Sequence, residues 1–395
     1  MNVAAHPSAR GGSGEGSLRA FLDVGHTYRA LRRDIDAAVL RVLESGSYVL
    51  GGEAAAFEAA FAGYCGAEHC VGVANGLDAL RLSLRAAGVS AGDEVIVSAH
   101  TFIATWLAVL DLGGRPVPVD ADPATMLLDP QGVAEAVTPR TKAVLIVPLY
   151  GLPVDLGEVG QDLARRGIPV IEDAAQAHGA TLNGRRVGTL GDIAAFSFYP
   201  GKNLGAFGDG GGVVTSRDDW AEAIRRWANY GAAQKYRHEE IGTNSRLDEM
   251  QAAVLAVKLR HLDEWTGRRR AVAATYLAAL GDVPGLVLPA VPVGADPAWH
   301  LFVIRHEKRD ELRALLAGRG VETLMHYPIP PHRSGALKGE FGALRLPVAE
   351  AICETCLSLP IGPHMEAADA ERVAGIVSDC ARKLDEAAMR SEARC

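Results

Sequence analysis

A single lysine stands inside a glycine-dense turn, at Lys202 in the segment SFYPGKNLGAFGDGGG (197–212). The chain holds 40 basic residues but only 7 lysines, so a lysine kept at this place draws attention. The turn is not a nucleotide P-loop, because Asn203 follows the lysine where serine or threonine is required and Phe196 replaces the first glycine. Unlike arginine, a lysine amine can condense with an aldehyde. The segment therefore predicts covalent chemistry at an amine.

Two further features complete this chemistry. Asp173 ends the apolar run 168–173, where an unpaired carboxylate is costly and needs a cationic partner. Gly76 lies in a turn that opens a helix, whose free N–H groups form an anion site. Taken alone, Asp173 fits a helix cap equally well, and turns like that of Gly76 are commonly structural. Together with Lys202 they match the needs of pyridoxal phosphate: an amine, a carboxylate for the ring nitrogen and a phosphate turn.

The elements that must position these residues alternate between short β-branched runs and helical stretches. This alternation predicts an α/β fold with a mostly parallel seven-stranded sheet flanked by helices, and loops at its carboxyl edge then converge on one site. Only a Gly-rich loop separates the last two runs, so an antiparallel or irregular pairing stays open there. The seven runs are 70–74, 94–99, 115–120, 143–151, 168–173, 193–199 and 211–216.

The remaining patterns divide the chain into a flexible leader (1–18), a large α/β domain (19–265) with an N-terminal helical segment, and a smaller α+β domain (266–395). In the large domain we expect a long helix over 245–264, capped by Ser245. In the small domain we expect a Pro- and Gly-rich linker, two strands and three helices. The helices expected at the start of the chain are 26–45 and 53–64, the linker is 281–299, the strands are 300–305 and 321–327, and the later helices are 309–318, 366–377 and 379–389.

Composition excludes several classes of function. A net charge of −8 argues against nucleic acid as a partner. The longest apolar stretch, 99–110, is too short to span a membrane, and the N-terminus lacks the apolar core of a secretory signal, which predicts a cytoplasmic protein. Cys353 and Cys356 form a C-x-x-C spacing without a second ligand pair, so we interpret them as small core residues and expect no metal site.

With these motifs the sequence resembles the sugar aminotransferases of the DegT/DnrJ/EryC1/StrS family, within fold type I of pyridoxal-phosphate enzymes. The resemblance runs from about residue 24 to residue 380. It implies that Lys202 holds the cofactor covalently and acts as the proton-transferring base. It also implies that Asp173 binds the ring nitrogen and that Gln176 lies near the ring hydroxyl.

The same resemblance implies the other cofactor contacts. Gly76, Leu77 and Ser197 would hold the phosphate, with Leu77 standing where many relatives carry threonine. Phe102 would stack on the ring. Asn244 would reach the phosphate of a neighbouring subunit, which implies a homodimer with shared active sites.

A finer resemblance is to the branch that aminates 3-keto-6-deoxyhexoses attached to dTDP, with L-glutamate as amino donor, in antibiotic or glycan biosynthesis. A 4-keto sugar or a keto-cyclitol remains an alternative substrate, and a non-catalytic cofactor-binding regulator is a further alternative. Lys202 argues against relatives that carry histidine there and dehydrate the sugar. The motifs are FYPGKNLGAFGDGG (198–211), HTFIATWLAV (100–109), NSRLDEMQAA (244–253) and HYPIPPH (326–332). The implied substrate contacts are Tyr230, Lys235, Tyr236, His238, Tyr327 and His332.

Overall fold

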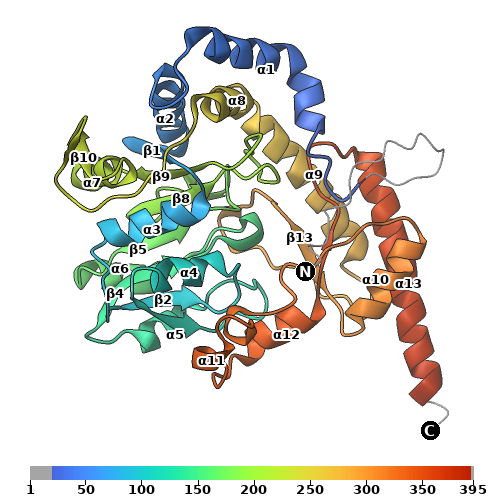
Figure 1. Ribbon diagram of the computed structural model, residues 1–395. Helices are drawn as coiled ribbons and strands as arrows, with labels where there is room; N and C mark the ends of the chain where they lie inside the picture. Colours follow the sequence, from blue (N-terminus) through green and yellow to red (C-terminus); the bar gives the residue numbers. More distant parts are fainter. Residues whose placement is uncertain (1–19, 393–395) are drawn as a thin grey trace.

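The computed structural model describes residues 20–392, so the expected leader lies outside the described residues. A central sheet carries helices on both faces, and the C-terminal part packs beside it, with the long helix α13 along the outer side (Figure 1). Among residues 20–392, no helix combines the length and the apolar character needed to cross a membrane.

The central sheet has seven strands in the order β1-β9-β8-β5-β4-β2-β3. All neighbours are parallel except β9, which runs antiparallel to β1 and β8. The predicted sheet is therefore confirmed. The exception at β9 arises because a loop, and not a crossover helix, joins β8 to β9. The strands are β1 (His69–Val73), β2 (Glu94–Ser98), β3 (Arg115–Val119), β4 (Thr141–Ile146), β5 (Val170–Asp173), β8 (Ile193–Ser197) and β9 (Gly211–Thr215).

The strands are nearly continuous apolar runs because helices cover both faces of the sheet. On one face, α3, α4 and α7 bury the side chains of most strands. On the other face, α2 and α8 cover the β1 side, and α5, α6 and α9 cover the β3 side. The helices are α1 (His26–Ser45), α2 (Gly52–Cys65), α3 (Gly76–Ala86), α4 (Ala104–Leu110), α5 (Pro130–Ala136), α6 (Gly157–Arg165), α7 (Asp218–Ala228), α8 (Glu249–Leu259) and α9 (Leu262–Leu280).

The C-terminal part is an α+β unit in which β13 and β14 pair antiparallel. Its core continues that of the sheet, since Phe302 and Val377 belong to the same hydrophobic cluster as Ile96 and Val144. The expected domain boundary at residue 265 falls inside α9 and stays a prediction. The elements are β13 (Phe302–Arg305), α10 (Arg309–Gly318), η2 (Pro331–Arg333), α11 (Lys338–Phe341), α12 (Pro347–Thr355), β14 (Cys356–Leu359) and α13 (Ala367–Glu392).

Two small sheets and a short turn complete the fold. A hairpin joins two strands beyond α7, and a second hairpin pairs with a strand from the linker. The elements are η1 (Leu149–Gly151), β10 (Ala232–Gln234), β11 (Arg237–His238), β6 (Thr181–Leu182), β7 (Arg185–Arg186) and β12 (Ala295–Asp296).

Three sequence-based expectations about local structure are wrong. The helix expected over 245–264 is two helices, because the chain breaks at Arg260–His261 and α9 then continues to residue 280. The strand expected over 321–327 forms only an isolated bridge between Leu324 and Ser358, and Pro328, which follows at once, lacks the N–H that a ladder needs. The two C-terminal helices are the single helix α13, since no helix-breaking residue separates them.

The C-x-x-C cysteines lie at the junction of α12 and β14. Both Cys353 and Cys356 are buried free thiols, and burial raises the pKa of each. Their interpretation as core residues is therefore confirmed. A buried, protonated thiol packs like a small apolar side chain.

Candidate active site

The loop between β8 and β9 carries Lys202 and is closely packed. The Lys258 ammonium donates to the Gly205 carbonyl at 2.6 Å, and a Cβ at Gly205 would stand 2.4 Å from the Pro200 oxygen, so only glycine fits. Burial lowers the pKa of the Lys202 amine to about 8, while the charge of nearby Asp173 acts in the opposite direction. The loop thus presents an amine that loses its proton near pH 8, which suits a nucleophile or a base.

Asp173 ends β5 and is buried. Its Oδ2 accepts a hydrogen bond from Thr105 Oγ1 at 2.7 Å, and its Oδ1 accepts a longer one from the Ala175 N–H at 3.4 Å. Burial raises the pKa of this carboxyl, and the Thr105 bond and the Lys202 charge oppose the rise. The residues after Asp173 form turns and no helix, so the helix-cap interpretation is wrong. The buried carboxylate is instead suited to pairing with a cationic group of a ligand.

The turn between β1 and α3 has the geometry expected of an anion site. Asn75 caps α3 by accepting the Asp78 N–H at 2.9 Å, and the amides of Gly76 and Leu77 precede that bond at the positive end of the helix. A Cβ at Gly76 would stand 2.7 Å from the Cβ of Ser197. The structure therefore brings together the three residues expected to hold a phosphate, and glycine is needed at 76 for this close approach.

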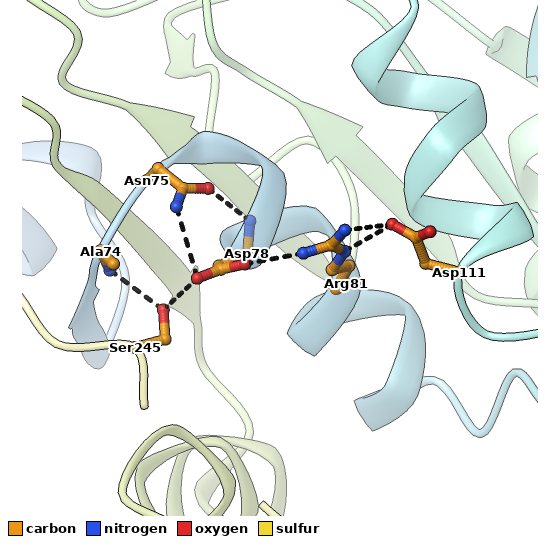
Figure 2. Close-up of polar contacts among 6 residues, drawn as sticks. All are labelled: Ala74, Asn75, Asp78, Arg81, Asp111 and Ser245. Carbon is orange, nitrogen blue, oxygen red and sulfur yellow. Dashed lines mark hydrogen bonds and ion pairs between the residues drawn. The ribbon is translucent and has the colours of Figure 1, made fainter. Parts of the chain in front are cut away.

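Figure 2 shows how the acid beside this turn is neutralised. Asp78 accepts hydrogen bonds from Ser245 Oγ at 2.7 Å and from Arg81 Nη1 at 3.1 Å, and Arg81 also pairs with Asp111. Ser245 Oγ in turn accepts the Ala74 N–H at 3.0 Å. Without these cationic and hydroxyl partners, a carboxylate so close to the helix start would oppose a bound anion. Ser245 thus stabilises the start of α3. The expectation from the sequence that Ser245 caps the following helix is wrong.

Gln176, Tyr327 and Phe102 come together over the carboxyl edge of the sheet. Gln176 Nε2 donates to the Tyr327 hydroxyl at 3.0 Å, and the Tyr327 and Phe102 ring centroids lie 5.3 Å apart. Phe102 is 52% exposed, although it follows a buried strand. An exposed aromatic ring at this edge can stack on a planar ligand.

The hairpin β10–β11 carries three of the expected substrate contacts, and a fourth, Tyr230, directly precedes it. The hairpin lies beside α7, on the side of the molecule away from α13 (Figure 1). His238 Nδ1 donates to the Tyr230 carbonyl at 3.0 Å, and Lys235 Nζ lies 5.2 Å from the centroid of the Tyr236 ring. Tyr236 is 83% exposed. These contacts are local to the hairpin and leave its aromatic tip in solvent.

Asn244, expected at the phosphate of a neighbouring subunit, and His332, an expected substrate contact, occupy different settings. Asn244 is exposed, and its backbone bridges that of Asn229. His332 is buried, with its Nε2 2.9 Å from Glu350 Oε1. Hydrogen bonds from His332 and Arg333 lower the pKa of Glu350 to about 2. The structure thus ties His332 to α12 and does not bring it together with the hairpin.

Sequence reasoning missed some residues that support the site. Thr105 holds Asp173, and Thr101 lies 2.8 Å from the Thr105 hydroxyl. Both, like His100, are buried polar residues within the apolar stretch 99–110. That interruption of an apolar run directly after a strand was the available signal. The role of Arg81, which pairs with Asp78, had no such signal.

Pyridoxal phosphate fits this donor set. Its phosphate suits the cradle between Gly76 and Ser197, its ring nitrogen suits the buried Asp173 carboxylate, and its aldehyde suits the Lys202 amine. Phe102 supplies an exposed ring for stacking. The fold and the site together define a pyridoxal-phosphate-dependent transferase of fold type I.

Comparison with known proteins agrees with this class. The DegT/DnrJ/EryC1/StrS aminotransferase family matches residues 29–378, and the chain belongs to this family. It is 54% identical over 368 residues to dTDP-3-amino-3,4,6-trideoxy-alpha-D-glucose transaminase of Streptomyces venezuelae, covering 93% of this chain and 97% of that protein. It is 47% identical to dTDP-3-amino-3,6-dideoxy-alpha-D-galactopyranose transaminase of Aneurinibacillus thermoaerophilus, covering 91% and 98%.

A solved structure shows the same similarity in three dimensions. The crystal structure of S. venezuelae DesV in complex with a ketimine intermediate has a TM-score of 0.91 and 53% identity, covering 93% of this chain and 99% of that one. The protein is accordingly a pyridoxal-phosphate-dependent aminotransferase. The fold, the enzyme class and the cofactor predicted from the sequence are confirmed.

Proposed function

We propose that the protein transfers the amino group of L-glutamate to a dTDP-3-keto-6-deoxyhexose, giving a dTDP-3-amino sugar. The observation that carries this proposal is the 54% identity, over nearly the full length of both chains, to a transaminase named for a dTDP-3-amino sugar. We further propose that this product serves the biosynthesis of amino sugars for antibiotics or cell-surface glycans. We propose a cytoplasmic location, where nucleotide sugars are made.

The chain's own residues divide the work of transamination. When bound, pyridoxal phosphate supplies an aldehyde and an electron-withdrawing ring. Lys202 would hold the cofactor aldehyde through its amine and, when free, would accept and return the proton that amino transfer moves. Asp173 would pair with the protonated ring nitrogen, and this ion pair would offset the cost of burying the carboxylate. The pKa of Lys202, about 8, lets the amine act as a base near neutral pH.

We further propose that two subunits share each site. Asn244 is exposed in the single chain, consistent with a side chain that reaches the phosphate in a partner. Large apolar side chains are also exposed where a partner would cover them. Those side chains are Leu40, Leu43, Leu50, Tyr236 and Ile241.

The acceptor sugar nucleotide would lie between the cofactor and the hairpin of the partner subunit. The hairpin offers a cation, Lys235, and the exposed ring of Tyr236, which suit a diphosphate and a base or sugar face. Tyr230 and His238 hold the hairpin's shape through their mutual hydrogen bond. Tyr327 would contact the sugar from the cofactor side. His332 would not touch the sugar directly but would hold the segment 326–332, which carries Tyr327, in place.

The test is product identification with a matched panel of acceptors. The holoenzyme and L-glutamate are incubated with dTDP-3-keto and dTDP-4-keto 6-deoxyhexoses and with a keto-cyclitol, and products are identified by mass spectrometry and NMR. We expect amination at C3 of the 3-keto sugar. Amination of only the 4-keto sugar or of the cyclitol would replace the proposed substrate. Absorbance of the bound cofactor is followed as glutamate is added. If glutamate causes no change in this absorbance, transamination from this donor is excluded.

A further inference from the structure

We propose that Tyr150 is a positioning residue that fixes the direction of a hydrogen-bond chain and thereby presents the Tyr327 hydroxyl as a donor to the bound ligand. The inference rests on the proposed function, since it concerns the same site. Tyr150 lies in η1, directly after β4, and is buried. Both its backbone and its phenol contact the residues around Tyr327.

The backbone of Tyr150 sets the orientation of Gln176. The Tyr150 N–H donates to Gln176 Oε1 at 2.7 Å. Because a backbone N–H can only donate, the amide oxygen must face it, and the amide nitrogen must face Tyr327. Gln176 Nε2 then donates to the Tyr327 hydroxyl at 3.0 Å. The Tyr327 oxygen is therefore the acceptor in that bond, and the hydroxyl proton is free to be donated to a different group.

The phenol of Tyr150 fixes the neighbouring segment in the same way. Its hydroxyl donates to the His326 carbonyl, which can only accept. That bond uses the single phenolic proton, so at the 2.6 Å contact with His100 the imidazole Nε2 must be the donor. His100 Nδ1 is then unprotonated and faces the Cys353 thiol at 3.7 Å. The series of hydrogen bonds runs from Cys353 through His100 and Tyr150 to the carbonyl of His326.

Burial keeps the members of this hydrogen-bond chain uncharged. It lowers the pKa of His100 to about 3 and raises the pKa of Cys353 and of Tyr150. No member changes charge at neutral pH, so the direction of each bond is preserved. On the opposite side, His326 Nδ1 contacts Ser358 Oγ of β14 at 2.8 Å. The His326 backbone is thereby held from two elements.

The consequence is a hydroxyl with a defined polarity next to the ligand. The Tyr327 and Phe102 ring centroids lie 5.3 Å apart. Burial of the phenol, together with the charge of the nearby Asp173 carboxylate, raises the pKa of Tyr327. The hydroxyl therefore stays protonated. The chemical group it recognises is an oxygen acceptor of the substrate beside the ring stacked at Phe102, such as the carbonyl oxygen of the keto sugar, and not an N–H or O–H donor.

The test compares Tyr150→Phe with Tyr276→Phe. Both tyrosines are buried, and both hydroxyls donate to a backbone carbonyl, that of His326 for Tyr150 and that of Pro360 for Tyr276. We expect a comparable fall in unfolding temperature for the two variants. Only Tyr150→Phe should raise KM for the keto sugar, by about tenfold, the effect of one lost hydrogen bond to substrate. In a Tyr327→Phe background the Tyr150→Phe substitution should add little, because both act through one hydroxyl. Additive effects, or equal KM changes in the two single variants, would overturn the proposal.

A second measurement is independent of turnover. Hydrogen exchange followed by mass spectrometry on the apoprotein should show faster exchange over residues 321–329 in Tyr150→Phe but not in Tyr276→Phe. Equal protection in both would also overturn the positioning role. If wild-type enzyme fails to aminate any sugar, the proposed function fails, while the exchange comparison still decides the role of Tyr150.

Discussion

The Lys202 loop and the β10–β11 hairpin both carry expected site residues, but they differ in burial and in bonding. Around Lys202, Asp173 and Gln176 are buried and bonded to residues from other strands and helices of the same chain. In the hairpin, Tyr236 is largely exposed, and the contacts of Lys235 and His238 stay within it. The chain thus orders Asp173 and Gln176 through its own long-range contacts and leaves the hairpin open.

This difference teaches which part of the site is preorganised. Buried side chains with fixed partners hold a catalytic geometry before the ligand arrives, because their rotamers are already restricted. An exposed hairpin holds no such geometry alone and must be ordered by a ligand or a second subunit. Substitutions in the first region should therefore change chemistry or stability, and substitutions in the second should change substrate affinity.

The largest effect is expected from Lys202→Ala. Loss of the only amine in the β8–β9 loop should abolish covalent binding of pyridoxal phosphate and lower turnover by at least about 10³-fold. Absorbance of the dialysed protein and a coupled assay measure the two effects. Lys258→Met, which removes the nearby amine bonded to Gly205, should keep the covalent absorbance band. A fully active Lys202→Ala protein would contradict the assignment.

A smaller effect is expected from Asp173→Asn. Its negative charge raises the pKa of Lys202, so its removal should shift that pKa below its value of about 8. The rate at which apoprotein captures pyridoxal phosphate should then reach its half-maximum at lower pH, while turnover falls about 10²-fold because the ring nitrogen loses its anionic partner. Asp111→Asn serves as a control, since that carboxylate pairs with Arg81 and not with Lys202. An unchanged pH profile in Asp173→Asn would show that the two groups do not interact.

In the hairpin, Tyr236→Ala tests the other side of the comparison. We expect KM for the sugar nucleotide to rise about tenfold with little change in kcat, because the exposed ring contributes binding and no chemistry. The free energy of unfolding should change by less than about 0.5 kcal/mol, as is usual for an exposed side chain. A large loss of stability, or a fall in kcat with constant KM, would place Tyr236 in the preorganised region.

The smallest effect on turnover is expected from Glu172→Gln, which concerns the buried region's stability. Glu172 Oε1 accepts the N–H groups of Gly188, Leu190 and Gly191 at 2.9 to 3.1 Å, and burial raises the pKa of its carboxyl to about 7. Between pH 4.5, the ordinary value, and pH 7, the folded state binds more protons than the unfolded state. The free energy of unfolding should therefore fall as pH rises through this window, by up to about 3 kcal/mol, since each pKa unit corresponds to about 1.4 kcal/mol.

Chemical denaturation at several pH values measures this slope. In Glu172→Gln the contribution of this group should vanish, because the amide does not titrate. The surface variant Glu222→Gln on α7 should retain the wild-type slope. If the free energy of unfolding changes with pH equally in Glu172→Gln and in wild type, Glu172 is ionised across this whole pH window.

The sequence was sufficient for the parts of the molecule that depend on local pattern. Each of the seven sheet strands is an apolar run, Asp173 ends one of them, and Lys202 lies in the Gly-rich loop after another, so both could be singled out from the sequence. The direction of β9 could only be left open, because a Gly-rich loop permits either pairing. The strand expected over 321–327 was wrong because Pro328, which follows at once, lacks the N–H that a ladder needs, so only the Leu324–Ser358 bridge forms.

What sequence reasoning could not reach depends on long-range contacts. Ser245 bonds to Asp78, 167 residues away, and Tyr150 bonds to His326, 176 residues away. Neither partner can be recognised from the residues that surround it. The role of Asn244 and the hairpin is a harder case, since their proposed partners lie in another copy of the chain.

The most direct test of this division is a mixed dimer. Lys202→Ala and Asn244→Ala chains, each with a different affinity tag, are co-expressed, and dimers carrying both tags are purified and assayed with glutamate and the dTDP-3-keto sugar. If sites are shared, each mixed dimer has one site with both native residues, and activity should recover to about half that of wild type. Activity no greater than the mean of the two parent variants, or an Asn244→Ala protein as active as wild type, would contradict a site built by two chains.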